Sequence, residues 1–130
     1  MAGIAVGCKG RSELVVTRED SAKMMGSGAL MVFSTPSMVA LMENAACNAL
    51  EPMLPEGSAS VGAQINVQHT SATPVGMRVY AEATLTSVEG NAFTFDIQAF
   101  DERGPIGKAT HRRVAVYTER FLRKVQEKLG

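Results

Sequence analysis

Three side chains that could carry proton-transfer chemistry lie within 35 residues of one another. Thr35 directly precedes a proline, Glu43 is the one acid of the apolar stretch that follows, and His69 ends an alternating stretch. A carboxylate can act as a nucleophile or general base, and an imidazole moves protons near neutral pH. A hydroxyl at a helix start lies where negative charge on a substrate oxygen is favoured. Together they indicate hydrolysis or proton transfer.

Each of the three residues also has a plainer interpretation. Thr35 could simply cap a helix, and Glu43 could mark the edge of that helix facing solvent. His69, on the apolar side of a strand, could be a hydrogen-bonded core residue. Taken one at a time, the residues favour these structural roles, so the catalytic hypothesis depends on the three occurring together.

Other candidate motifs are weaker. The stretch Gly26-Ser27-Gly28 is short and follows no predicted strand, so it is not a dinucleotide-binding loop. Cys47 has no basic neighbour in the sequence and is predicted to be an inert packing thiol. The cluster His111-Arg112-Arg113 could hold phosphates, although at least one of its side chains should face solvent if it forms a strand.

The element that must position Glu43 is a helix predicted to start at Thr35-Pro36 and to end before Pro52. Threonine can cap exposed backbone N–H groups, and proline at the first helical position loses no helical hydrogen bond. Apolar residues recur on one wide face, and the polar residues are small and uncharged, so we expect a sheet to enclose this helix. The face comprises Met38, Val39, Leu41, Met42, Ala45, Ala46, Ala49 and Leu50, and the polar residues are Ser37, Asn44 and Asn48.

The remaining segments predict strands around that helix. Residues 61–69 alternate, with Val61, Ala63, Ile65, Val67 and His69 expected on the helix side. Further strands are predicted at 12–18, 77–89, 92–101 and 106–117, most simply as an antiparallel meander, and residues 118–129 form an amphipathic tail. This order predicts an α+β fold in which one antiparallel sheet wraps around a central apolar helix.

The segment 19–33 has no clear period. It could be a lid over a pocket, but an ordinary connector that packs its methionines on the core is the favoured interpretation.

Composition limits the class of protein. A chain of 130 residues with 45% hydrophobic residues fits one domain, predicted to span 1–130. Thirteen basic residues balance thirteen acidic ones, so no overall field favours nucleic acid or a membrane. No apolar stretch approaches ~20 residues, the start lacks a secretory signal, and two cysteines without metal-type spacing suit reduced thiols. We expect a cytoplasmic protein without a metal ion.

Four segments of the chain resemble a known family. These are Thr35 to Glu43, Val61 to Thr70, Ala72-Thr73-Pro74-Val75-Gly76, and Ile106 to Arg113. In order and spacing they are similar to the hot-dog-fold acyl-CoA thioesterases, and within them to the fluoroacetyl-CoA thioesterase-like group. The similarity runs from about Ser12 to the C-terminal tail.

The resemblance implies a hot-dog homodimer, which could assemble further, with an acyl-thioester pocket at the subunit interface. It implies that Thr35, Glu43 and His69 carry the reaction, and it places Gly62 beside the acyl group. Phe33 and Arg113 are the further residues expected to contact substrate. No cofactor is implied, because CoA is part of the substrate.

The segment Met24 to Phe33 is shorter than the family's aromatic lid and has Phe33 as its one aromatic residue. We therefore expect no selectivity for a fluorinated acyl group, and a broader or different range of small or medium acyl-CoAs. The sequence predicts an acyl-CoA thioesterase; the alternatives are a non-catalytic acyl-CoA binder or sensor and a hot-dog hydratase. It further predicts that Thr35, Glu43 and His69 converge on one pocket.

Overall fold

One five-stranded antiparallel sheet dominates the computed structural model, which describes residues 3–130. The strands are β1 (Lys9–Val15), β2 (Ser58–His69), β3 (Arg78–Glu89), β4 (Ala92–Asp101) and β5 (Gly104–Tyr117). Their order is β1-β3-β4-β5-β2, and every neighbouring pair is antiparallel. The predicted meander is therefore correct for β3, β4 and β5, whereas β2 crosses over to pair with β5.

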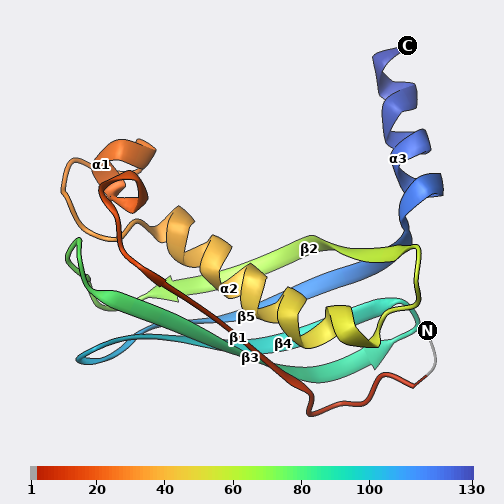
Figure 1. Ribbon diagram of the computed structural model, residues 1–130, viewed down its shortest axis with the longest axis horizontal. Coiled ribbons are helices and arrows are strands. Elements are labelled where there is room, and N and C mark those ends of the chain that lie inside the picture. Colours follow the sequence, from red (N-terminus) through yellow and green to blue (C-terminus); the bar gives the residue numbers. More distant parts are fainter. Residues whose placement is uncertain (1–2) are drawn as a thin grey trace.

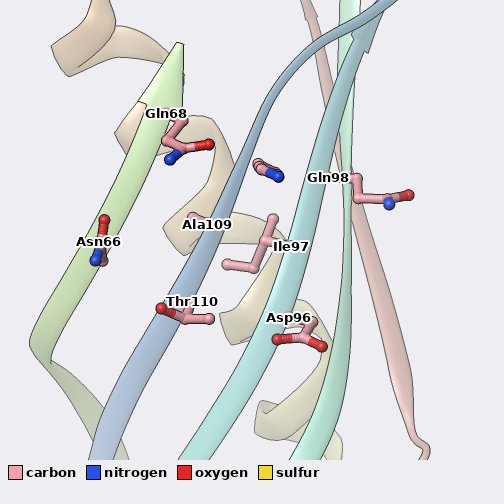
Figure 2. A pocket seen from close by; sticks show the side chains of 8 residues that line it. Asn66, Gln68, Asp96, Ile97, Gln98, Ala109 and Thr110 are labelled. Atoms are coloured by element: carbon pink, nitrogen blue, oxygen red, sulfur yellow. The ribbon is translucent and has the colours of Figure 1, made fainter. Parts of the chain in front are cut away.

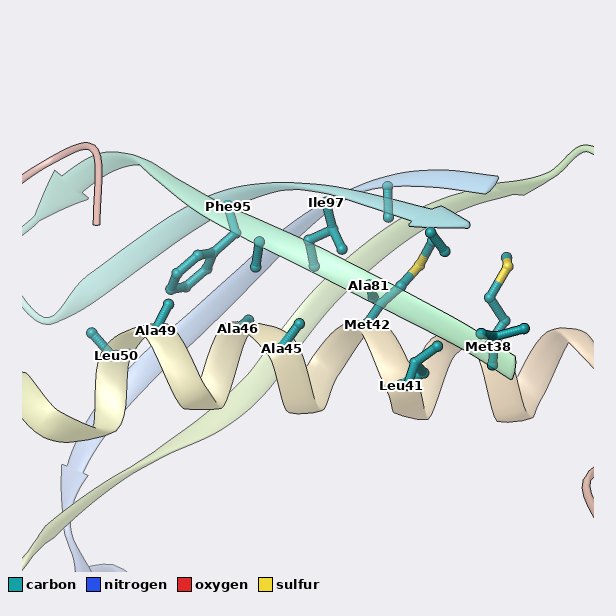
Figure 3. Close-up of a cluster of buried hydrophobic side chains, with 14 of the residues drawn as sticks. Met38, Leu41, Met42, Ala45, Ala46, Ala49, Leu50, Ala81, Phe95 and Ile97 are labelled. Carbon is teal, nitrogen blue, oxygen red and sulfur yellow. The ribbon is translucent and has the colours of Figure 1, made fainter. Parts of the chain in front are cut away.

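The long helix α2 (Thr35–Leu50) lies across one face of this sheet (Figure 1). Figure 3 shows its apolar side chains pointing at the strands, with Phe95 and Ile97 of β4 above them. Met38 and Met42 are fully buried, and burying a side chain of this size stabilises the fold by roughly 1.5–3 kcal/mol. The predicted α+β architecture, a sheet wrapped around a central apolar helix, is confirmed.

The first strand contacts α2 more closely than a side chain would allow. A Cβ atom on Gly10 would overlap the backbone of Ala45 and Ala49, so glycine lets β1 lie directly against the helix. The small polar residues of α2 also face this strand: Ser12 donates a hydrogen bond to Asn44, and Asn48 donates one to the carbonyl of Arg11. The polar edge of α2 is thus used to hold β1.

The connector between β1 and α2 differs from its prediction. It contains a 3₁₀ turn (Arg18–Asp20) and the short helix α1 (Ala22–Met25), whose start is capped by Ser21 and whose end is the left-handed Gly26. This geometry leaves three methionines 40–50% exposed: Met24, Met25 and Met31. The prediction that they pack on the core is wrong: the connector contributes Val16 and Phe33 to the core instead.

The C-terminal helix α3 (Thr118–Gln126) projects away from the sheet beyond the end of β5 (Figure 1). It contains no buried residue, and Leu122, Val125 and Leu129 stay exposed. Two further 3₁₀ turns follow the main helices, at Glu51–Met53 and Glu127–Leu129. Within residues 3–130, no helix has the length and apolarity needed to cross a membrane.

Candidate active site

The start of α2 brings Thr35 and His69 together. Ser34, one residue before the helix, is the N-cap and accepts a hydrogen bond from the N–H of Ser37. The predicted cap, Thr35, is therefore wrong by one residue, and its hydroxyl is free for another contact. Thr35 Oγ1 lies 2.8 Å from His69 Nδ1, at the end of β2. The hydroxyl and the imidazole thus share a hydrogen bond at the positive end of the helix dipole.

The imidazole of His69 is held in an apolar setting. Desolvation by burial lowers the pKa of His69 below its usual value, and the nearby backbone of Ser71 partly opposes this shift. Phe33 packs edge-on to the ring, with centroids 6.5 Å apart. His69 Nε2 is buried and has no hydrogen-bond partner within residues 3–130. These surroundings favour the neutral imidazole, which can accept a proton.

A pocket of about 300 Å³ opens beside this pair. Its walls come from the connector, the start of α2 and the segment that follows β2. The lining residues are Ala22, Ser27, Val32, Phe33, Ser34, Thr35, His69, Thr70, Ser71 and Ala72. Phe33, predicted to contact substrate, forms part of this wall.

Glu43 belongs to a second polar group, farther along α2. Its side chain is 39% exposed, so the predicted position at the margin of the apolar face is confirmed. Glu43 Oε2 lies 3.5 Å from Arg113 Nη1 and 4.0 Å from His111 Nε2. Glu43 thus presents its carboxylate beside a buried guanidinium, and a carboxylate can act as a nucleophile or general base.

Gly62 lies against Glu43 because β2 contains a bulge. The register with β5 shifts between Gly62 and Gln64, which turns Gly62 toward the helix and leaves Ala63 exposed. The predicted alternation, with Val61 and Ala63 facing the helix, is wrong at this point for that reason. A Cβ atom on Gly62 would lie 2.7 Å from Glu43 Oε2, so the absence of a side chain leaves room for the carboxylate.

Arg113 is buried, and protein groups contact all three nitrogens of its guanidinium. Only 5% of the residue is exposed. Its Nε donates to Ser60 Oγ, its Nη2 donates to the Ser60 carbonyl, and its Nη1 contacts His111 and Glu43. Arg112 faces solvent, as expected for one member of this cluster. Arg113 therefore borders Glu43 without being an exposed phosphate-binding residue.

Within one chain, the three predicted catalytic residues fall into two groups. Thr35 pairs with His69, whereas Glu43 contacts Arg113 and His111. Glu43 lies eight positions after Thr35 on the helix, a rise of about 12 Å. A single chain therefore does not bring all three side chains to one pocket, although the sequence predicted this convergence.

A hollow larger than the pocket beside His69 lies elsewhere. It has a volume of about 400 Å³ and lies on β2, β4 and β5, with α2 behind the strands (Figure 2). Its lining is mostly polar: Asn66, Gln68, Asp96, Ile97, Gln98, Lys108, Ala109 and Thr110. None of the predicted site residues lines it, so size alone does not locate the site.

Two residues of the second group were not predicted individually: Ser60 and His111. His111 is 2% exposed and alternates with Arg113 on β5, flanked by the buried Ala109 and Ala115. Both basic side chains therefore lie on the helix side of β5, and the sequence carries no clear local signal for this because Val114 and Val116 favour the opposite face. No metal-binding group of three or more His, Cys, Asp or Glu side chains occurs in the described part of the chain.

Comparison with known proteins gives a consistent result. The profile of the fluoroacetyl-CoA-specific thioesterase family matches residues 16–119. The fluoroacetyl-CoA thioesterase of Streptantibioticus cattleyicolor is 43% identical over 97 residues, which are 75% of this chain and 70% of that protein.

Solved structures agree over almost the full chain. A variant of the fluoroacetyl-CoA-specific thioesterase in complex with fluoroacetate and CoA is 35% identical, with a TM-score of 0.85 over 91% of this chain and 99% of that one. A hot-dog-like protein of Thermanaerovibrio acidaminovorans is 28% identical, with a TM-score of 0.88 over 98% and 94%. The chain therefore has the hot-dog fold and belongs to the family of fluoroacetyl-CoA-specific thioesterases, enzymes that hydrolyse acyl-CoA thioesters.

Proposed function

We propose that this thioesterase acts on a small or medium acyl-CoA at the pocket beside Thr35 and His69. The observation that carries the proposal is the hydrogen bond between these two side chains at the start of α2, next to a pocket of about 300 Å³. The relative solved with fluoroacetate and CoA supports an acyl-CoA substrate. The connector carries one aromatic residue, Phe33, which supports a broader or different acyl specificity than that for fluoroacetyl.

In the proposed reaction, Glu43 attacks the thioester carbonyl or removes a proton from the attacking water. A C–O bond forms, the C–S bond breaks, and CoA leaves as a thiolate that takes up a proton. Where Glu43 is the attacking group, water then hydrolyses the resulting acyl–Glu43 anhydride, which releases the carboxylate product and regenerates Glu43. Neutral His69 assists this proton transfer, and the Thr35 hydroxyl donates to the carbonyl oxygen as it gains negative charge. The N-terminal end of α2 stabilises the same charge.

Two structural features support a homodimer joined through β2. This strand is an edge of the sheet and leaves a row of backbone groups without a strand neighbour. Helix α3 begins where β5 ends, beside β2, and exposes Leu122 and Val125. A second copy of the chain would also bury these apolar side chains. The dimer could associate further through other faces.

The proposed dimer also reconciles the two polar groups. Antiparallel pairing of two β2 strands about an axis near Ile65 and Asn66 would set Gly62 opposite the partner subunit's His69. Glu43 of one subunit would then approach the Thr35–His69 pair of the other. The three side chains would converge between subunits rather than within one.

The decisive experiment measures thiol release from a panel of acyl-CoAs. The purified protein should hydrolyse at least one small or medium acyl-CoA, and Glu43→Ala and His69→Ala should each lower kcat by about 1,000-fold or more. Glu82→Ala is a matched control, because this exposed glutamate lies on β3 and contacts Arg11. Equal rates for the wild type, Glu43→Ala and His69→Ala would refute the assigned roles.

We also propose a cytoplasmic location, which the free thiols of Cys8 and Cys47 support.

A further inference from the structure

His111 is a buried polar residue that the proposed reaction does not use. It lies on β5, pairs with Ile65 of β2 and Phe95 of β4, and is 2% exposed. A buried imidazole needs partners for both ring nitrogens, and these are Gln64 and Arg113. The identity of the partners determines which nitrogen holds the proton.

A guanidinium can donate hydrogen bonds but cannot accept them. Arg113 Nη1 lies 3.0 Å from His111 Nε2, so Nε2 must be the unprotonated, accepting nitrogen. His111 Nδ1 then carries the proton and donates it to the Gln64 carbonyl, 2.8 Å away. The contacts therefore require a neutral imidazole with its proton on Nδ1.

Both hydrogen bonds of His111 act on the surroundings of Glu43. Gln64 is the first residue after the register shift in β2, and this bulge turns Gly62 toward the carboxylate. Arg113 is held by Ser60 through Nε and Nη2, while Nη1, the nitrogen nearest Glu43, has His111 as its closest partner. Without an acceptor at His111, Glu43 would be the one group among residues 3–130 within hydrogen-bond distance of Arg113 Nη1.

We propose that His111 is a positioning residue: as a neutral acceptor it fixes Arg113 Nη1 and the β2 bulge, and thereby orients Glu43. The charged groups that face its ring are Arg113 and Glu43, at 3.0 and 4.0 Å from Nε2. Desolvation lowers the pKa of His111, as does Arg113, while the Gln64 hydrogen bond and Glu43 raise it. The positioning role of His111 rests on the proposed function of Glu43. The tautomer of His111 is independent of that function.

The tautomer is tested by nitrogen-15 NMR of the ring nitrogens at pH 7.5. The chain has only two histidines, so the spectra of His69→Gln and His111→Gln assign both rings. We expect His111 to be neutral with its proton on Nδ1. A proton on Nε2, or a doubly protonated ring, would overturn the proposal whatever the enzyme's activity.

The positioning role is tested by three variants. Glutamine offers an acceptor near the place of Nε2, asparagine offers a donor near Nδ1 but no acceptor toward Arg113, and phenylalanine offers neither. We expect kcat to fall less than about tenfold in His111→Gln and about 100-fold in His111→Asn and His111→Phe, with KM changed less than about threefold.

Thermal unfolding of the same proteins separates positioning from folding. His111→Gln and His111→Asn should have similar Tm values, so a kcat difference between them would report the acceptor. Equal kcat values for these two variants, or losses of kcat that follow Tm, would overturn the positioning role. If Glu43→Ala retained activity, the proposed function would fail while the NMR result still decided the tautomer.

Discussion

The two polar groups along α2 are built in opposite ways. At the helix start, Thr35 and His69 are uncharged partners beside a pocket, and one ring nitrogen of His69 has no partner within the described chain. Two turns later, Glu43 contacts a buried guanidinium whose other donors are bound by Ser60 and His111. The first group has unused hydrogen-bonding capacity, and the second is almost saturated. The difference suggests that the first group meets the substrate carbonyl while the second presents a fixed carboxylate.

The largest expected effect comes from mixing two inactive variants. If the two groups meet across the proposed dimer, Glu43→Ala and His69→Ala subunits should complement each other after joint refolding. Random mixing would make half of the dimers mixed, each with one intact site, so activity should return from background to about one quarter of the wild-type value.

Thiol release measured over a range of mixing ratios checks this prediction. Each variant refolded alone is the control. No recovery, in a mixture shown by mass spectrometry to contain mixed dimers, would mean that Glu43 and His69 act within one chain.

A smaller loss of kcat is expected from variants of Thr35, at the start of α2. Thr35→Val keeps the shape of the side chain but removes the hydroxyl, and losing one donor to an oxyanion lowers kcat by about 100-fold. Thr35→Ser should stay within about tenfold of the wild type, because the hydroxyl can still reach His69. Steady-state kinetics distinguish the two variants, and similar kcat values for Val and Ser would show that the hydroxyl does not take part.

Gly62→Ala should have a weaker effect. The new Cβ would lie 2.7 Å from Glu43 Oε2, so the carboxylate must move by several tenths of an ångström. We expect kcat to fall by about tenfold while the Thr35–His69 hydrogen bond is unaffected, and a crystal structure of the variant checks both. Ala63→Gly, on the exposed side of the bulge, is the matched control. A wild-type rate in Gly62→Ala would show that the position of Glu43 tolerates this shift.

The smallest effect concerns stability in mild acid. Burial lowers the pKa of both His69 and His111 in the folded state. Below about pH 6.5, the ordinary histidine value, the unfolded chain therefore binds more protons than the folded chain, and stability falls as the pH falls. Urea unfolding between pH 8 and 5 should show this decline, and it should be shallower in His111→Gln than in the wild type. An identical slope in the two proteins would show that His111 contributes nothing to it.

The sequence by itself determined much of the framework. The Thr35-Pro36 signal placed the start of α2 within one residue of its observed position. The wide apolar face of the helix predicted that a sheet encloses it. Alternation and turn residues located β4 at its observed bounds and β3 within one residue. The residue types of the site were also readable, since Glu43 is the one acid of the apolar stretch and His69 ends the alternating stretch.

Only the tertiary structure decided how these residues are grouped. Ser34 caps α2 and so frees the Thr35 hydroxyl, a choice between two adjacent hydroxyl residues that depends on where the chain enters the helix. The bulge after Gly62 reverses the faces of β2, because one extra residue changes the register with β5 without changing the local pattern of residue types. Arg113 is buried because Ser60 and Glu43, distant in sequence, bind its guanidinium together with the neighbouring His111, and such long-range compensation has no local signal.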